Sequence, residues 1–252
     1  MSVLCFLLLF GVVDGPALTA PSVAPSSVSF AATAAATADQ PREKEGEQVL
    51  AKYLQISRNQ ILRGVSMVAH FAGRLPKMKM TATVDARRRI AGNGAIEYEV
   101  SSRTGDNTVW KEIILRYING EMENAGKDNS RVAVTPANYK FKYKGERERD
   151  GRLASVYEVT PRKKREGLFR GEIWVDVDTA LPVLESGRLV KSPSVFLKKV
   201  QFTREYAVQD GVPVPKALQT SIETRFWGTA ELDIQYSELQ WEPSAAAQNP
   251  SE

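Results

Sequence analysis

Cysteine and histidine are almost absent from this chain. Cys5 is the only cysteine and His70 the only histidine in 252 residues. Cys5 lies in an apolar run near the start, so removal of that run leaves no thiol for a disulfide, a nucleophile or a metal site. Most hydrolytic and metal centres use a histidine cluster or a histidine beside a nucleophile. We therefore expect no catalytic residues, no metal site and no cofactor, and thus no enzyme.

A strong charge of one sign is also lacking. Lysine and arginine number 34 against 30 aspartates and glutamates, which gives a net charge of +4. This small excess is spread along the chain, so it does not predict a nucleic-acid partner. With 42% hydrophobic and 25% charged residues, the composition is that of an ordinary globular protein of one or two domains.

Long hydrophobic runs are missing except at the start. The run 3–13 has the length of a signal-peptide core and is too short for a membrane-spanning helix. No lysine or arginine precedes it, and cleavage after Ala20 competes with Ala-x-Ala sites at 32–34 and 36–38. We expect a signal peptide at 1–20 and a periplasmic or secreted protein. The alternative is a buried N-terminal strand or helix.

Two further segments lack the apolar residues that a core needs. Residues 21–43 are rich in alanine, serine and proline, and are predicted to be a disordered linker. Residues 243–252 are similar and are predicted to be a disordered tail. This leaves 44–242 as a single folded domain.

Within that domain, apolar residues follow two different periods. Segments 44–57 and 107–123 have helical spacing, with a strand over 109–117 as the alternative for part of the second. Alternation predicts strands at 63–75 and 78–84, then a polar turn from Arg87 to Gly94, and a further strand at 96–100. It predicts more strands from 139 almost to the end. Such a series of alternating segments indicates an antiparallel meander. The predicted fold class is α+β: a large curved antiparallel sheet with helices covering its apolar face.

Asp176 and Asp178 form the most suggestive acidic pair. A calcium loop would need further acidic ligands and a glycine at set spacing, and a glycosidase would need carboxylates facing each other across a cleft. We interpret both as turn residues, with Asp176 facing water at the end of a strand. A hydrolase that uses either aspartate is the rival hypothesis. His70 falls on a polar strand face and is predicted to be exposed.

Two basic stretches have ordinary interpretations. Residues 162–165 (RKKR) are predicted to be a solvated hairpin tip, with contact to anionic lipid or a partner as the alternative. Lys140, Lys142 and Lys144 alternate with aromatic residues. The two kinds therefore lie on opposite strand faces, which does not predict a nucleic-acid platform.

Residues 167–240 resemble exported bacterial proteins related to the LolA-like outer-membrane lipoprotein-sorting family. The resemblance rests on LFRGEIWVDVDTALPVLESG (168–187), KSPSVFLKKVQFTREY (191–206) and GVPVPKALQTSIETRFWGTAELDIQY (211–236). The pattern departs from the family at the turn 194–196, where the aromatic comes one place late, and at Val212 and Val214, which replace aromatics. The resemblance implies a half-open β-barrel with helices covering its concave face, and a cavity that takes acyl chains or another hydrophobic ligand.

The inward face of the predicted sheet is rich in methionine and aromatic residues, which suits an adaptable apolar pocket. Plain core packing is the alternative for each residue. The predicted lining of a hydrophobic-ligand site consists of Met78, Met80, Tyr98, Phe141, Tyr157, Phe169, Ile173, Phe202, Tyr206, Ile222 and Phe226.

The function predicted from sequence is that of an exported, non-enzymatic protein that binds a lipid or an acylated lipoprotein in an apolar cavity. Transport of lipid or lipoprotein to the outer membrane is one role of such a carrier, and a membrane-associated protein is a further partner class. The alternative is a periplasmic interaction or sensor module of the same fold whose core is filled by its own side chains.

Overall fold

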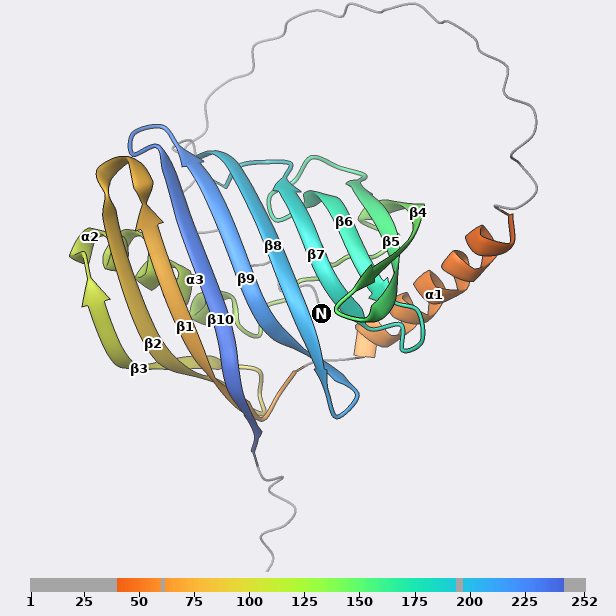
Figure 1. Cartoon of the computed structure of the whole chain (residues 1–252), viewed down its shortest axis with the longest axis horizontal. Helices are drawn as coiled ribbons and strands as arrows, with labels where there is room; N and C mark the ends of the chain where they lie inside the picture. Colours follow the sequence, from red (N-terminus) through yellow and green to blue (C-terminus); the bar gives the residue numbers. More distant parts are fainter. Residues whose placement is uncertain (1–39, 60–61, 194–196, 243–252) are drawn as a thin grey trace, which may run out of the picture.

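A computed structural model describes residues 40–242 except 60–61 and 194–196 (Figure 1). The predicted signal peptide at 1–20, the tail at 243–252 and the turn at 194–196 lie outside the described residues. The first described element, α1 (Gln40–Asn59), begins inside the segment 21–43 that was expected to be a linker. The helix predicted over 44–57 is therefore present, and it extends beyond the predicted segment at both ends.

The described residues form one ten-stranded sheet in the order β3-β2-β1-β10-β9-β8-β7-β6-β5-β4. All neighbouring strands are antiparallel, and β3 and β4 are the two edges, so the sheet is curved but not closed (Figure 1). This confirms the predicted α+β class with a large antiparallel sheet. The strands are β1 (Val65–Leu75), β2 (Met80–Ile90), β3 (Ile96–Gly105), β4 (Tyr139–Arg149), β5 (Arg152–Pro161), β6 (Phe169–Asp176), β7 (Pro182–Leu189), β8 (Leu197–Gln209), β9 (Val212–Thr224) and β10 (Thr229–Trp241).

The pairing of β1 with β10 joins the two halves of the sheet. Val65 lies opposite Trp241 and Arg74 opposite Glu231, so the first and last strands of the domain are direct neighbours. Every other neighbouring pair is consecutive in the chain. Alternation of buried and exposed residues along β1 and β2 follows the period of two that predicted them.

The polar turn predicted from Arg87 onward is wrong. β2 continues to Ile90, and the turn closes only at 91–95, where the Gly94 amide donates to the Ala91 carbonyl at 2.8 Å. Arg88 points inward from β2 and is only 4% exposed. A charge at this position is tolerated because Glu121 neutralises it, as described below.

Two helical segments cover the concave face of the sheet (Figure 1). α1 packs over the β4–β6 side through Val49 and Tyr53, which are both buried. Its closest approach is at Gly46: a side chain there would begin 2.6 Å from the Tyr143 ring, and the Tyr157 hydroxyl donates to the Gly46 carbonyl at 2.6 Å. The absence of a side chain at this position allows the helix to rest on the sheet.

The second cover runs without a break through α2 (Asn107–Val109), a π-helical turn labelled η3 (Trp110–Leu115) and α3 (Arg116–Asn124), and we call it the α2–α3 helix. Asp106 caps its start by accepting from the Thr108 amide at 2.7 Å. The helical prediction over 107–123 is confirmed, and the alternative strand is wrong. Gly73 on β1 lets this helix approach, because a side chain there would begin 2.8 Å from Val109.

The core fills most of the space between the sheet and these covers. Its largest members with almost no exposure include Phe71, Tyr139, Tyr157 and Phe169. Burying each such side chain contributes about 1.5–3 kcal/mol, which is the main force holding the helices on the sheet. Among the described residues, no helix is long and apolar enough to cross a bilayer.

Candidate functional site

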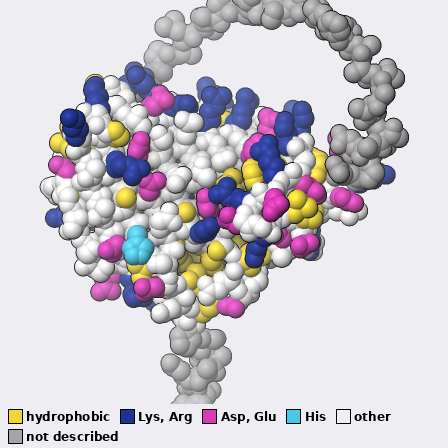
Figure 2. Space-filling model, viewed as in Figure 1, with side chains coloured by type: hydrophobic (Ala, Val, Ile, Leu, Met, Phe, Trp, Pro, Cys, Tyr) yellow, Lys and Arg dark blue, Asp and Glu magenta, His cyan; other side chains and the backbone are white. Residues whose placement is uncertain are grey.

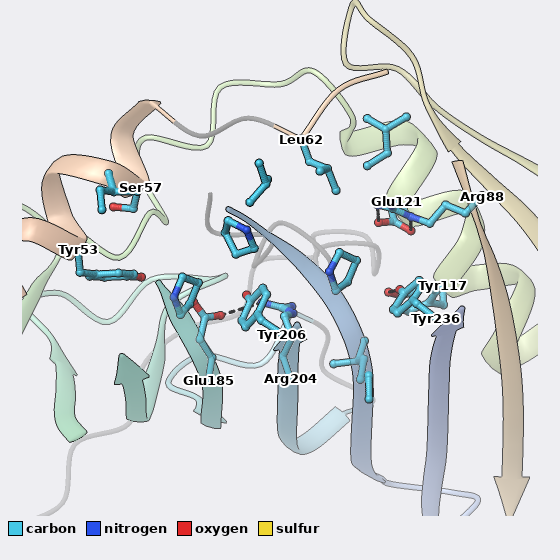
Figure 3. Close-up of a pocket in the computed structure, with 18 residues that line it drawn as sticks. Tyr53, Ser57, Leu62, Arg88, Tyr117, Glu121, Glu185, Arg204, Tyr206 and Tyr236 are labelled. Carbon is cyan, nitrogen blue, oxygen red and sulfur yellow. Dashed lines mark hydrogen bonds and ion pairs between the residues drawn. The ribbon is translucent and has the colours of Figure 1, made fainter. Parts of the chain in front are cut away.

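A cavity of about 80 Å³ lies on the concave face between α1 and the α2–α3 helix (Figure 3). It lies toward the end of the sheet at which β1, β7 and β9 begin and β2 ends. Apolar side chains and prolines make up most of its wall. They are Ile56 from α1, Leu62, Ile90 from β2, Pro182 from β7, and Val212, Pro213, Pro215, Ala217 and Leu218 from β9.

A buried ion pair forms one side of the cavity. Arg88 of β2 contacts Glu121 of α3 through two nitrogens, and its Nε lies 3.2 Å from one carboxylate oxygen. The Tyr98 hydroxyl donates to the same carboxylate. Burial opposes the charge of Arg88, but Glu121 and Tyr98 outweigh that effect and raise the pKa of the guanidinium. Arg88 and Glu121 thus form an ion pair inside the cavity wall.

A second buried ion pair lies across the cavity. Arg204 of β8 donates to the carboxylate of Glu185 on β7 at 2.9 Å, beside Tyr206 (Figure 3). Burial opposes the charge of Arg204, but Tyr206 and Glu185 outweigh it, so its pKa is raised. Burial also raises the pKa of the Tyr206 phenol. Each buried charge in the cavity wall thus has an opposite charge on a neighbouring element.

Tyrosines complete the polar part of the wall. The hydroxyls of Tyr117 and Tyr236 lie 3.4 Å apart, and the guanidinium of Arg88 lies 5.9 Å from the centre of the Tyr236 ring. Burial raises the pKa of Tyr53, and raises that of Tyr236 to about 12. At neutral pH the cavity therefore presents neutral phenols, neutralised ion pairs and an apolar wall. Such a surface suits an amphipathic molecule better than an ion.

The predicted ligand-lining residues do not share one place. Only Tyr206 lines the cavity, and Tyr98 reaches it indirectly through Glu121. Tyr157, Phe169, Ile173 and Phe202 are buried in the main core, and Met80, Phe141 and Ile222 are partly buried against it.

Met78 and Phe226 do not point inward as expected. Met78 lies in the short helical turn η2 (Pro76–Met78), and Phe226 lies beyond the end of β9. Their exposed fractions are 41% and 69%. Both belong to turns at the end of the sheet away from the cavity.

Sequence reasoning missed the four charged residues of the cavity wall: Arg88, Glu121, Glu185 and Arg204. A signal for them was present, because each interrupts an otherwise apolar face. Arg204 has the same strand parity as the buried Val200 and Phe202, and Glu121 lies one helical turn after Ile118. A charged residue at a position where the periodicity predicts an apolar one indicates either that this part of the face is exposed or that the charge has a buried partner of opposite sign. Only the structure identifies that partner.

The two aspartates of 176–178 form a turn, as predicted. Asp176 accepts from the amide and the hydroxyl of Thr179 at 2.8 and 2.7 Å. The prediction that it faces water is wrong: Asp176 is only 5% exposed, because the turn folds over its carboxylate. Asp178 is exposed, and its carbonyl accepts from Lys52 of α1 at 3.1 Å.

His70 is exposed on β1, as predicted. Its ring nitrogens lie 2.7 Å from the Asp85 carboxylate and 3.0 Å from the Ser237 hydroxyl. Hydrogen bonds from Ser102 and from His70 lower the pKa of Asp85. Across residues 40–242, as far as they are described, no group of three or more histidine, cysteine, aspartate or glutamate side chains is placed to hold a metal ion.

The basic stretch 162–165 lies in an exposed connection between β5 and β6. Arg162 donates to the Pro136 carbonyl at 2.7 Å and Arg165 to the Arg131 carbonyl at 3.0 Å. Lys163 and Lys164 are exposed. The stretch is thus anchored at both ends, with its central lysines in solvent.

No protein-family model matches the chain, and no curated protein matches it in sequence. Solved structures with a similar arrangement include a LolA superfamily protein from Nitrosomonas europaea, with 11% identity, coverage of 82% of this chain and 97% of that one, and a TM-score of 0.43. A DUF1329 family protein from Desulfovibrio piger has 13% identity, coverage of 81% and 94%, and a TM-score of 0.42. A putative outer membrane lipoprotein-sorting protein domain from Vibrio parahaemolyticus has 13% identity, coverage of 81% and 94%, and a TM-score of 0.36. Each of these similarities extends over about four-fifths of this chain.

Proposed function

We propose that this chain is an exported, non-enzymatic binding protein that takes up a lipid or the acylated end of a lipoprotein on the concave face of its sheet. The observation that carries the proposal is the cavity between α1 and the α2–α3 helix, with its apolar wall and its neutralised ion pairs. Apolar surface meets the acyl chains, and the phenols and ion pairs meet the polar end. Each CH₂ group buried there contributes about 0.8 kcal/mol.

Uptake of an acyl chain requires one cover to move. The cavity of about 80 Å³ is well below the roughly 300–1,000 Å³ of typical ligand pockets. α1 is the candidate lid because its Tyr53 and Ile56 line the cavity, and the polar bonds that hold it in place include those from Tyr157 to Gly46 and from Lys52 to Asp178. Its movement away from β4–β6 would join the cavity to the core space beneath the helix.

The first test is native mass spectrometry of the protein purified from the exported fraction, followed by solvent extraction. A discrete added mass that extracts as lipid supports a carrier and identifies the class of its cargo. A bare polypeptide mass that remains bare after incubation with lipid vesicles contradicts the proposal.

A matched pair of variants tests whether the cavity is the binding place. Leu218 lines the cavity in one buried row with Arg204 and Ile234, while the next residue, Gln219, points to the other face of β9 and is exposed. Leu218→Trp fills the cavity and is expected to abolish binding of a fluorescent fatty acid, while Gln219→Trp leaves it unchanged. Equal binding by both variants would place the ligand elsewhere.

One observation favours a second candidate function. The concave face is already largely filled by the protein's own buried side chains, from Phe71 at β1 to Phe169 at β6. A filled core suits an interaction or sensor module that binds a membrane-associated or periplasmic protein without taking up lipid. A bare mass in the first test, together with unchanged cooperative unfolding in the presence of fatty acid, supports this candidate.

A further inference from the structure

Exposed apolar side chains gather at the end of the sheet opposite the cavity. Met78 lies in the turn between β1 and β2, and Phe226 and Trp227 lie in the turn between β9 and β10. Their exposed fractions are 41%, 69% and 39%. The remaining strongly exposed large apolar residues of the described chain, Val100, Met122, Leu153 and Trp241, belong to separate elements away from these turns.

The two turns are ordered by local contacts and touch each other. In the β9–β10 turn, the amide and hydroxyl of Thr224 both donate to the Gly228 carbonyl at 2.8 Å, and the Trp227 amide donates to the Thr224 hydroxyl at 3.0 Å. A side chain at Gly228 would begin 3.2 Å from the Lys77 side chain of the other turn. The apolar tips are thus held in place before any partner arrives, which lowers the entropy lost on binding.

Exposed cations surround these tips. Lys77 and Lys79 flank Met78, Arg225 precedes Phe226, and Lys198 follows Leu197, which pairs with Thr224. Within the described part of the chain, none of these four cations forms an ion pair with a carboxylate. Figure 2 shows dark-blue side chains of lysine and arginine all along this end of the sheet, at the top of the view. We call Met78, Phe226, Trp227 and the four cations the rim.

The opposite end of the sheet has a different character. Its turns contain Asp150, Asp178 and Asp210, and its exposed Trp241 donates to the Asp210 carboxylate at 3.1 Å. The turns at the opposite end thus carry carboxylates, whereas the rim turns 76–79 and 225–228 carry lysine and arginine and no carboxylate.

We infer that the rim is a docking surface for an anionic lipid bilayer. Protruding aromatic tips can enter the interfacial layer of a bilayer, where tryptophan is favoured, while the flanking lysines and arginine meet anionic headgroups. A nucleic acid would use a groove that follows its backbone, and a partner helix would need a hollow apolar groove. The rim offers convex turn tips, which fit a broad, soft surface. This inference does not rest on the proposed function, because the cavity lies at the other end.

Vesicle co-sedimentation of the full chain tests the inference. The wild-type protein is expected to bind vesicles made of phosphatidylcholine and phosphatidylglycerol in equal parts, to bind pure phosphatidylcholine much more weakly, and to be released by high salt. Replacing Lys77 or Lys198 by glutamine is expected to weaken partitioning about fivefold for each lysine. Phe226→Ser with Trp227→Ser is expected to weaken it about tenfold or more.

The chain supplies matched controls at other positions. Leu153→Ser removes a comparably exposed apolar residue, and Arg63→Gln and Arg152→Gln remove exposed cations at the opposite end. These controls are expected to bind vesicles like the wild type. All variants keep the same N-terminal segment, so any difference in binding is caused by the substituted residues. Thermal unfolding of each variant checks that it is folded.

Two outcomes overturn the inference. One is that the wild-type protein does not sediment with phosphatidylglycerol vesicles, or binds DNA or an acidic protein instead. The other is that rim and control variants lose binding equally. Loss of fatty-acid binding in Leu218→Trp with unchanged vesicle binding would separate the cavity from the rim.

Discussion

The two ends of the sheet use the same residue types for opposite purposes. At the cavity end, aromatic rings and charged groups are enclosed together, and each of the buried arginines Arg88 and Arg204 faces a glutamate. At the rim, the aromatic rings of Phe226 and Trp227 are exposed and the neighbouring cations have no ionic partners among the described residues. The residue type therefore does not decide the role. The decisive difference is whether a cover helix lies above the side chain.

This difference has an energetic consequence. Enclosed charges are costly to leave alone, so substitutions at the cavity end should reduce the stability of the fold. Exposed groups away from such features contribute within about 0.5 kcal/mol to stability, so substitutions at the rim should affect only what the rim contacts.

Alkaline pH should unfold the domain from the cavity end. Burial raises the pKa of Tyr98, Tyr117, Tyr206 and Tyr236 above the ordinary value of 10.0, to about 12 for Tyr236. The unfolded chain loses these protons at lower pH than the folded chain does. The contribution of the buried phenols to stability is therefore fully present below pH 10 and falls as pH rises toward their pKa values in the folded protein. Ultraviolet difference spectroscopy should show the phenols ionising together with unfolding. Phenol ionisation near pH 10 in a still folded protein would contradict the burial argument.

Breaking one buried ion pair should be the most damaging single substitution. Glu121→Leu leaves Arg88 buried without a counter-charge and is expected to lower the free energy of unfolding by about 3–5 kcal/mol. Adding Arg88→Met in the same chain should restore most of that loss, because an apolar pair replaces the ionic one. Denaturant unfolding measures both. If the double variant is no more stable than the single one, the ion pair has a role in the fold besides neutralising its two buried charges.

Gly73→Val should loosen the α2–α3 helix. Its side chain would meet Val109 and Ile114 of the helix, and the expected cost is about 1–3 kcal/mol. Gly92→Ala is the control, because nothing lies within 4 Å of the added carbon at that position. Hydrogen exchange should show faster opening of the helix in Gly73→Val only. Equal exchange in both variants would mean that the helix can shift without loss.

The aspartate turn offers a smaller contrast within two residues. Asp176→Ala removes two hydrogen bonds to Thr179 in a buried turn and should cost about 1.5 kcal/mol. Asp178→Ala affects an exposed side chain and should stay within about 0.5 kcal/mol. Thermal unfolding measures both effects. Equal costs would mean that the turn is held by its backbone alone.

Rim substitutions should have the smallest effect on the fold. Lys77→Gln, Lys198→Gln and Phe226→Ser are each expected to change the free energy of unfolding by less than about 0.5 kcal/mol. Denaturant unfolding of these variants beside Glu121→Leu gives the direct contrast between the two ends. A large loss at any of these rim positions would show that the rim is part of the core.

Periodicity in the sequence predicted most of the elements. Alternation along β4 to β10 gave the antiparallel sheet, and helical spacing gave α1 and the α2–α3 helix, because these patterns record which face is covered. It failed at Arg87–Arg89, where Arg88 looks like a turn residue until Glu121, on a different element, is placed beside it. It also failed at Phe226, which continues the parity of Ile222 and Thr224 although the strand ends at Thr224. Local patterns cannot report a partner or a strand end that depends on distant residues.

The neighbouring positions of β1 and β10 have a consequence for how the chain is handled in the cell. The seam between the two halves of the sheet joins residues 65–74 to residues 231–241. During synthesis, the first strand must wait for the last before that seam can form, and pairings so distant in sequence form slowly. A polypeptide that cannot complete its sheet until its final strand is available stays unfolded longer, and during that time the apolar faces of its strands are open to other proteins.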